Sequence, residues 1–151
     1  MKEDIKLFRE IRMRLAQELH DLTLDQLNFI PKSHNNNIMW NIGHCLVVQQ
    51  LLSYKLSGLP IYIEESMIPK YGKGSKPEAP VTQEEVDFIK DMLIKSVDLL
   101  EKDAEEGKFK TFQPLTVGFG AHLTSVEDSV RFNNAHEGLH YGYLLALKKL
   151  L

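Results

Sequence analysis

The sequence predicts an all-α protein of one domain, residues 1–151, built as a four-helix bundle. Four segments place apolar residues at the three- and four-residue steps of a helix face. Side chains that commonly begin helices precede three of these segments. The chain also has one long irregular stretch, residues 59–81, which is the length of a crossover between helices rather than of a tight hairpin.

The first helix is expected over residues 4–21, because its apolar residues line one face. They are Ile5, Phe8, Ile11, Leu15, Leu19 and Leu22, with Arg12 beside Leu15. Thr23-Leu24-Asp25-Gln26 then resembles a capping box, and we expect a short helical turn that ends near Pro31. A polar connection over 32–37 follows, in which an asparagine can cap the next helix.

The second helix is expected from about Ile38 to Ser57, and Gly58 and Pro60 end it. It is apolar around most of its circumference, which indicates a central position. The proline- and glycine-rich connection over 59–81 follows. A crossover of this length allows the second and third helices to run in the same direction.

Thr82-Gln83-Glu84-Glu85 is a capping box for the third helix, which Gly107 ends. Residues 108–123 form the second long connection. A strand pair within Phe112–Ala121 is an alternative that we disfavour, because nothing else in the chain offers a partner strand. Thr124-Ser125-Val126-Glu127 is a further capping box, and the fourth helix runs from there to the end of the chain.

Composition gives no support to several classes of protein. The net charge is −3 and no basic stripe occurs, so the sequence gives no reason to expect nucleic-acid binding. The single cysteine, Cys45, cannot form an intrachain disulfide. The charged N-terminus lacks the apolar core of a signal peptide, and no apolar stretch is long enough to cross a membrane. We therefore expect a cytoplasmic protein.

Three histidines form the candidate site. His136 and His140 lie four residues apart, so their imidazoles share one face of the fourth helix and can converge on one ion. His44 lies in the middle of the second and most hydrophobic helix. A lone histidine on an apolar face is more often a hydrogen-bonded core residue, but three inward imidazoles match an open, catalytic type of metal site. We predict one divalent ion on His44, His136 and His140.

The same stretch also matches His-Glu-x-x-His, the zinc metalloprotease motif, with Glu137 as general base. We disfavour that interpretation for three reasons. Only eleven residues follow His140, Glu137 lies about 100° around the helix from His136, and no substrate-binding strand is predicted. His20 lies near the end of the first helix, and His34 and His122 lie in connections. A solvated role is expected for each, with a fourth metal ligand or a substrate contact as the alternative. Cys45 is expected to be a small buried residue.

Two motifs carry a family resemblance. Trp40-x-x-Gly43-His44 and His136-Glu137-x-x-His140-Tyr141-Gly142 resemble the DinB-like (DinB/YfiT) superfamily of metal-dependent proteins, and the resemblance extends over nearly the whole chain in helix order and loop lengths. It implies a four-helix bundle with an up-down-down-up course, often a homodimer, with zinc or nickel on His44, His136 and His140. The apolar faces of the second helix point to the same homodimer.

Characterised members of that family include transferases that use the thiols bacillithiol or mycothiol, and a maleylpyruvate isomerase. The resemblance therefore implies a metal-dependent thiol transferase or hydrolase that acts on a small molecule, with a low-molecular-weight thiol as possible cosubstrate. Glu137 or Tyr143 would assist as proton carrier or as a partner of a ligand. Tyr62 and Tyr71 of the crossover would cover the mouth of the site. The alternative is a non-enzymatic binding or structural protein stabilised by its metal.

Overall fold

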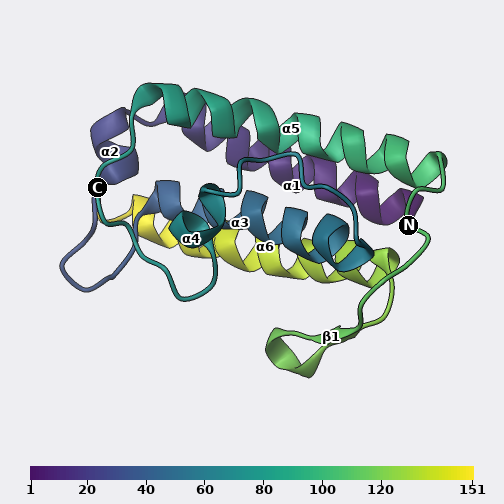
Figure 1. Ribbon diagram of the computed structural model, residues 1–151. Helices are drawn as coiled ribbons and strands as arrows, with labels where there is room; N and C mark the ends of the chain where they lie inside the picture. The colour runs from purple at the N-terminus through teal and green to yellow at the C-terminus, as the bar shows by residue number, and fades with distance from the viewer.

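Four long helices pack side by side in the computed structural model, which describes residues 1–151 (Figure 1). They are α1 (Lys2–Asp21), α3 (Ile38–Gln49), α5 (Gln83–Glu105) and α6 (Val126–Lys148). A π-helical turn, η1 (Gln50–Tyr54), and a 3₁₀ turn, η2 (Lys55–Ser57), continue α3 to the end that the sequence predicts. The predicted bundle of four long helices is confirmed.

The helices run in two directions. Figure 1 shows α1 and α6 running from right to left, and α3 and α5 from left to right. Hydrogen bonds from Asn134 to the Asp4 carbonyl and from Lys148 to Glu18 join α6 to α1 in the same direction. The stretch between η2 and α5 crosses back along the bundle. It contains the short helix α4 (Met67–Tyr71), which packs against α3.

Side-chain caps begin α2, α3 and α5 where the sequence places them. Thr23 and Gln26 form the complete capping box of the short helix α2 (Leu24–Asn28). Asn37 accepts a hydrogen bond from the backbone NH of Trp40 at the start of α3, and Thr82 accepts one at the start of α5. Each cap satisfies a backbone donor that the helix itself leaves unpaired.

The start of α6 differs by one residue from the prediction. Ser125 is the cap and accepts a hydrogen bond from the backbone NH of Asp128, whereas Thr124 stands outside the helix and donates its hydroxyl to the Asp128 carboxylate. Two neighbouring hydroxyl residues each suit a cap, and the sequence does not distinguish them. Ser125 therefore takes the place that we assigned to Thr124.

The preference against strands in the second connection was wrong. β1 (Leu115–Thr116) pairs antiparallel with β2 (His122–Leu123), and the 3₁₀ turn η3 (Gly118–Gly120) lies between them. The partner strand lies within the connection itself, so none was needed elsewhere in the chain. We call residues 115–123 the hairpin; the alternative strand pair was right in kind but lay slightly too early in the sequence.

Helix α3 occupies the centre of the molecule. Every residue of α3 except Val48 is buried, against α2, α5, α6 and the short helix α4 of the crossover. Its apolar circumference is therefore explained within a single chain, and it no longer argues for a homodimer through this helix. None of the helices combines the length and the apolarity that a bilayer crossing requires.

A polar network ties the crossover to α5. The buried carboxylate of Asp103 accepts hydrogen bonds from the hydroxyls of Tyr54 and Tyr62, each at 2.9 Å, and from Lys108 at 2.6 Å. Tyr62 is thereby held at this network and does not cover the mouth of the histidine site, which corrects the prediction for that residue.

Candidate metal centre

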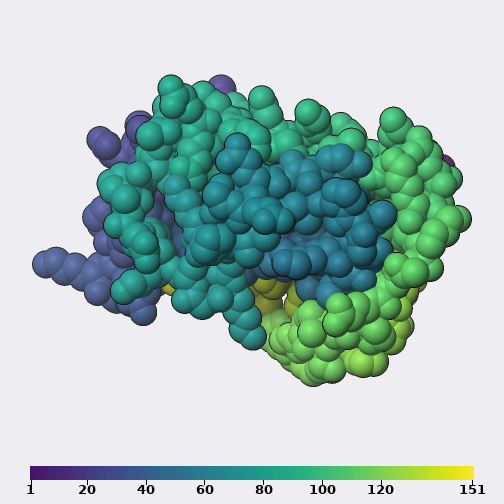
Figure 2. Space-filling view, in the orientation of Figure 1, coloured from purple at the N-terminus to yellow at the C-terminus, as the bar shows by residue number.

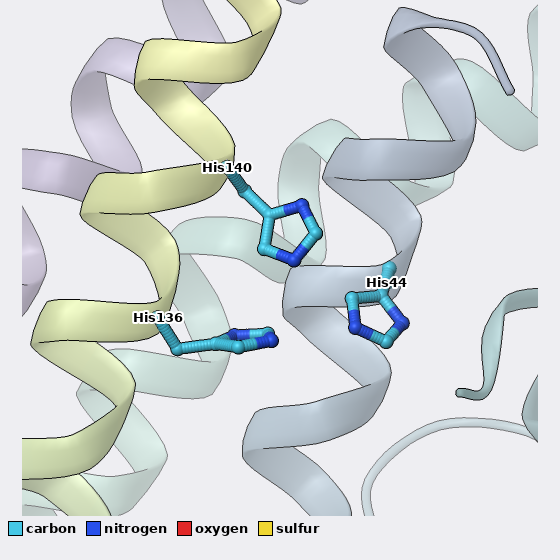
Figure 3. A group of neighbouring side chains, drawn as sticks. All are labelled: His44, His136 and His140. Atoms are coloured by element: carbon cyan, nitrogen blue, oxygen red, sulfur yellow. The ribbon is translucent and has the colours of Figure 1, made fainter. Parts of the chain in front are cut away.

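His44 from α3 and His136 and His140 from α6 come together inside the bundle. Their candidate ligand nitrogens all lie within 4.8 Å of one another, and no carboxylate or thiol joins the group. Figure 3 shows the three rings meeting between the two helices, with one nitrogen of each ring turned toward a common centre. The sequence prediction that these residues form one cluster is therefore met, although they lie up to 96 positions apart (140 − 44).

Hydrogen bonds orient two of the three rings. His44 donates its Nδ1–H to the carbonyl of Tyr71 at 2.6 Å. His140 donates its Nδ1–H to the Asn41 side-chain oxygen at 2.8 Å, and the Asn41 amide group is fixed because its Nδ2 donates to the Asn37 carbonyl. With Nδ1 protonated, each ring keeps a lone pair on Nε2, the arrangement that metal-binding histidines typically have.

His136 has no such anchor. Its Nδ1 is buried without a hydrogen-bond partner, and its ring stacks on Phe132 with centroids 5.7 Å apart. An unpaired buried polar atom costs roughly 1–3 kcal/mol, and a bound ion is one of the partners that can satisfy it. On the other side of the cluster, Trp40 stacks on His44 with centroids 4.7 Å apart and an interplanar angle of 12°.

The three imidazoles are neutral at physiological pH. Burial, assisted by the two neighbouring imidazoles, lowers the pKa of His136 to about 3. Burial and His44 lower the pKa of His140 to about 4, and burial also lowers the pKa of His44. Neutral rings offer the lone pairs that a divalent cation needs, and three histidine nitrogens are a known ligand set for catalytic zinc. The residues present therefore fit a metal ion.

A pocket of about 580 Å³ opens above the three histidines. Figure 2 shows a hollow between the teal crossover and the light-green hairpin, with yellow atoms of α6 at its floor. Its walls come from α3, η1, α6, the hairpin and one residue of the crossover, Lys73. The hairpin wall, which includes Leu115 and Phe119, was missed at the sequence level. The only local sequence feature that could have indicated this wall is the aromatic residue Phe119 between two glycines, Gly118 and Gly120.

Residues 7–144 match the sequence pattern of the DinB superfamily. The chain belongs to the DinB superfamily. A comparison with curated proteins finds no match. The resemblance drawn from the two motifs is thus confirmed at the level of the family, and the DinB four-helix bundle agrees with the four packed helices described above.

In this DinB superfamily protein, Glu137 lies away from the candidate site. Its fully buried carboxylate accepts hydrogen bonds from Nε and Nη2 of Arg12 at 2.7 and 2.6 Å. Arg12 also donates to the carbonyl of Cys45 at 3.1 Å. Burial raises the pKa of Glu137 to about 7, and the guanidinium of Arg12 limits that rise. Both carboxylate oxygens are occupied, and Glu137 does not line the pocket.

Tyr143 also lies outside the pocket. It is 38% exposed on α6 and packs against His34, with ring centroids 5.7 Å apart. Tyr71 contributes its backbone carbonyl to His44, while its hydroxyl donates to Glu85 at 2.5 Å, so its side chain points away from the mouth of the site.

The remaining histidines do not join the three-histidine cluster. His20 is exposed, His34 contacts Ser33, and His122 pairs with the hydroxyl of Thr116 in the hairpin. Cys45 is fully buried, and burial raises the pKa of its thiol well above the ordinary value, which agrees with its predicted role as a small core residue.

Proposed function

We propose that the protein is a metal-dependent enzyme that acts on a small molecule, either by transferring a thiol to an electrophile or by hydrolysis. The observation that supports the proposal is the place of the three histidines: neutral, oriented imidazoles lie at the floor of an apolar pocket of about 580 Å³. A set of three protein ligands leaves a fourth position open for a substrate.

The chain's own residues would hold zinc or nickel through His44, His136 and His140. When bound, such a cation supplies Lewis acidity, which lowers the pKa of a thiol or of water and polarises an electrophile. The Tyr71 carbonyl and the Asn41 amide keep two of the imidazoles oriented for this purpose. A substrate bound against the apolar walls would displace water from the pocket and so strengthen the electrostatic interactions there.

The geometry weighs against a metalloprotease. A protease of the His-Glu-x-x-His type needs a carboxylate that faces the metal-bound water, whereas both oxygens of Glu137 are held by Arg12. A purely structural metal site is also less well supported. Structural zinc is normally closed by four protein ligands, whereas here three histidines form the group and all three line a pocket.

Metal content tests the first part of the proposal. We expect protein purified without a histidine tag to carry about one divalent ion per chain, and His136→Ala to lose most of it. His122→Ala is the matched control, because His122 is exposed in the hairpin and should leave metal content unchanged. The single tryptophan, Trp40, stacks on His44, so titration with Ni²⁺ should quench its fluorescence in the wild type. Full metal occupancy in His136→Ala would show that the three histidines do not form the metal site.

Activity tests the second part. The metal-loaded protein is given monochlorobimane with several biological thiols, beside a panel of unstructured peptides. Metal-dependent conjugation that disappears in His136→Ala supports thiol transfer. Peptide cleavage that is lost in Glu137→Gln, without conjugation, would reverse the ranking in favour of a protease. A fully metal-loaded protein with neither activity favours the metal-stabilised binding protein.

We also propose a homodimer, now through α6 rather than α3. From residue 132 to residue 147 the only charged side chain is Glu137, which is buried, so the exposed face of α6 is uncharged. That face consists of Ala135, Gly138, Leu139, Gly142, Tyr143, Leu145 and Ala146. An identical face on a second copy matches it in polarity. Light scattering at micromolar concentration should give twice the chain mass, and Leu145→Glu should give the monomer. A monomeric wild type contradicts the proposal.

A further inference from the structure

The pocket above the histidines has apolar walls and no acidic side chain. Val48 and Leu51 contribute carbon surface from α3 and η1, Leu139 contributes it from α6, and Phe119 from the hairpin. Apart from the histidines, its one charged lining residue is Lys73, on the crossover. A ligand bound here therefore meets hydrocarbon along its length and a single positive charge.

The charge of Lys73 is not compensated within the chain. Its neighbour Lys70 forms an ion pair with Glu85 at 2.6 Å, whereas Lys73 is exposed and has no ion pair. Gly74 follows it with φ +87°, a backbone conformation that turns the chain directly after Lys73. A free ammonium group at the edge of a pocket without carboxylates attracts anions and disfavours cations.

Phe119 is the least covered of the large hydrophobic side chains, at 82% exposure. It stands at the tip of the hairpin with a φ of 61°, between Gly118 and Gly120, and lines the pocket. An exposed aromatic ring is unfavourable in water, and a bound apolar group would cover it. The ring therefore offers apolar surface to a ligand in the pocket.

We propose that the pocket binds a small amphiphile, with an apolar body against Val48, Leu51 and Phe119 and one organic anionic group at Lys73. The volume of about 580 Å³ lies in the usual range for small-molecule sites. This inference rests on the proposed function only in that the histidines form the floor of the same pocket. It names the class of substrate: an organic anion with an apolar body.

Two dyes test the inference in metal-free protein. 8-Anilino-1-naphthalenesulfonate and N-phenyl-1-naphthylamine share one aromatic body, and only the first carries an anionic sulfonate. Both should bind the wild type with increased fluorescence. Lys73→Gln should lower the affinity for the sulfonate dye roughly fivefold, because one solvent-accessible ion pair is lost. The affinity for the neutral dye should stay unchanged. Lys73→Arg should restore binding, and Lys95→Gln, an exposed lysine on α5, is the matched control.

Blocking variants locate the dyes. Val48→Trp should fill the pocket and abolish binding of both dyes, and Leu139→Trp repeats the test at a position that is 55% exposed and so tolerates a larger side chain. Circular dichroism verifies the fold of each variant. Dye binding that survives both substitutions places the dyes elsewhere and overturns the site. If Lys73→Gln weakens the binding of both dyes equally, or does not weaken the binding of the sulfonate dye, the proposal that Lys73 binds an anionic group is wrong.

The outcome is separable from that of the metal site. Metal content and dye binding by the metal-free wild type are measured independently, so either proposal can fail without the other. A wild type that contains no metal but shows the expected dye pattern refutes the proposed function and supports this inference. A wild type that contains metal and binds neither dye supports the metal site and refutes this inference.

Discussion

Removal of Arg12 should reveal how strongly the bundle depends on one buried ion pair. Arg12 and Glu137 are both fully buried, and two hydrogen bonds of 2.6 and 2.7 Å join them. Loss of one partner of such a pair leaves an uncompensated buried charge, which typically costs about 3–5 kcal/mol. We expect Arg12→Met to reduce the free energy of unfolding by that amount.

The double variant Arg12→Met/Glu137→Met separates the charge from the packing. It removes both charges and fills the space with apolar groups, so most of the stability should return. About 1 kcal/mol should stay lost, because the carbonyl of Cys45 no longer receives a hydrogen bond from Arg12. Urea denaturation followed by circular dichroism measures Arg12→Met, Glu137→Met and the double variant.

Arg9→Met is the control for the Arg12 experiment. Arg9 also pairs with carboxylates, those of Asp98 and Glu101, but at the surface, where an ion pair contributes about 1 kcal/mol or less. A loss below 1 kcal/mol in Arg12→Met, or a double variant as unstable as the sum of the single variants, would refute the reasoning.

Two further predictions concern packing and pH. In Gly43→Ala, the new Cβ would lie 2.5 Å from the buried ring of Tyr71, whose carbonyl orients His44, so stability should fall by about 1–3 kcal/mol and metal binding should weaken in a Ni²⁺ titration. Gly138→Ala, with nothing within 4 Å, should show neither effect. Burial alone would raise the pKa of Asp103, but its three hydrogen bonds outweigh burial and hold that pKa below the ordinary value. Its stabilising contribution is thus complete above the unfolded-state pKa and is lost as pH falls through the folded-state pKa. Asp103→Asn should cost about 2–4 kcal/mol at neutral pH and remove this part of the acid dependence in urea titrations at several pH values. A variant that keeps the wild-type acid dependence contradicts the assignment.

Much of this protein is specified by local sequence patterns. The four helices follow from apolar spacing and from caps such as Thr82, because both act within a few residues of chain. The pairing of His136 with His140 follows from helical geometry alone. His44 was identified because a polar residue in the centre of an apolar helix needs a partner. The outlines of the bundle and the three candidate ligands were therefore predictable.

Other features depend on which segments meet in space. Arg12 and Glu137 are 125 positions apart, and nothing near either residue in the chain shows that they pair. The carbonyl of Tyr71 reaches His44 only because the crossover lies along α3, and Phe119 borders the pocket only because the hairpin lies beside α6. Apolar spacing shows that a helix face is buried, but not which element covers it. The direction of Glu137 and the walls of the pocket were therefore decided by tertiary packing.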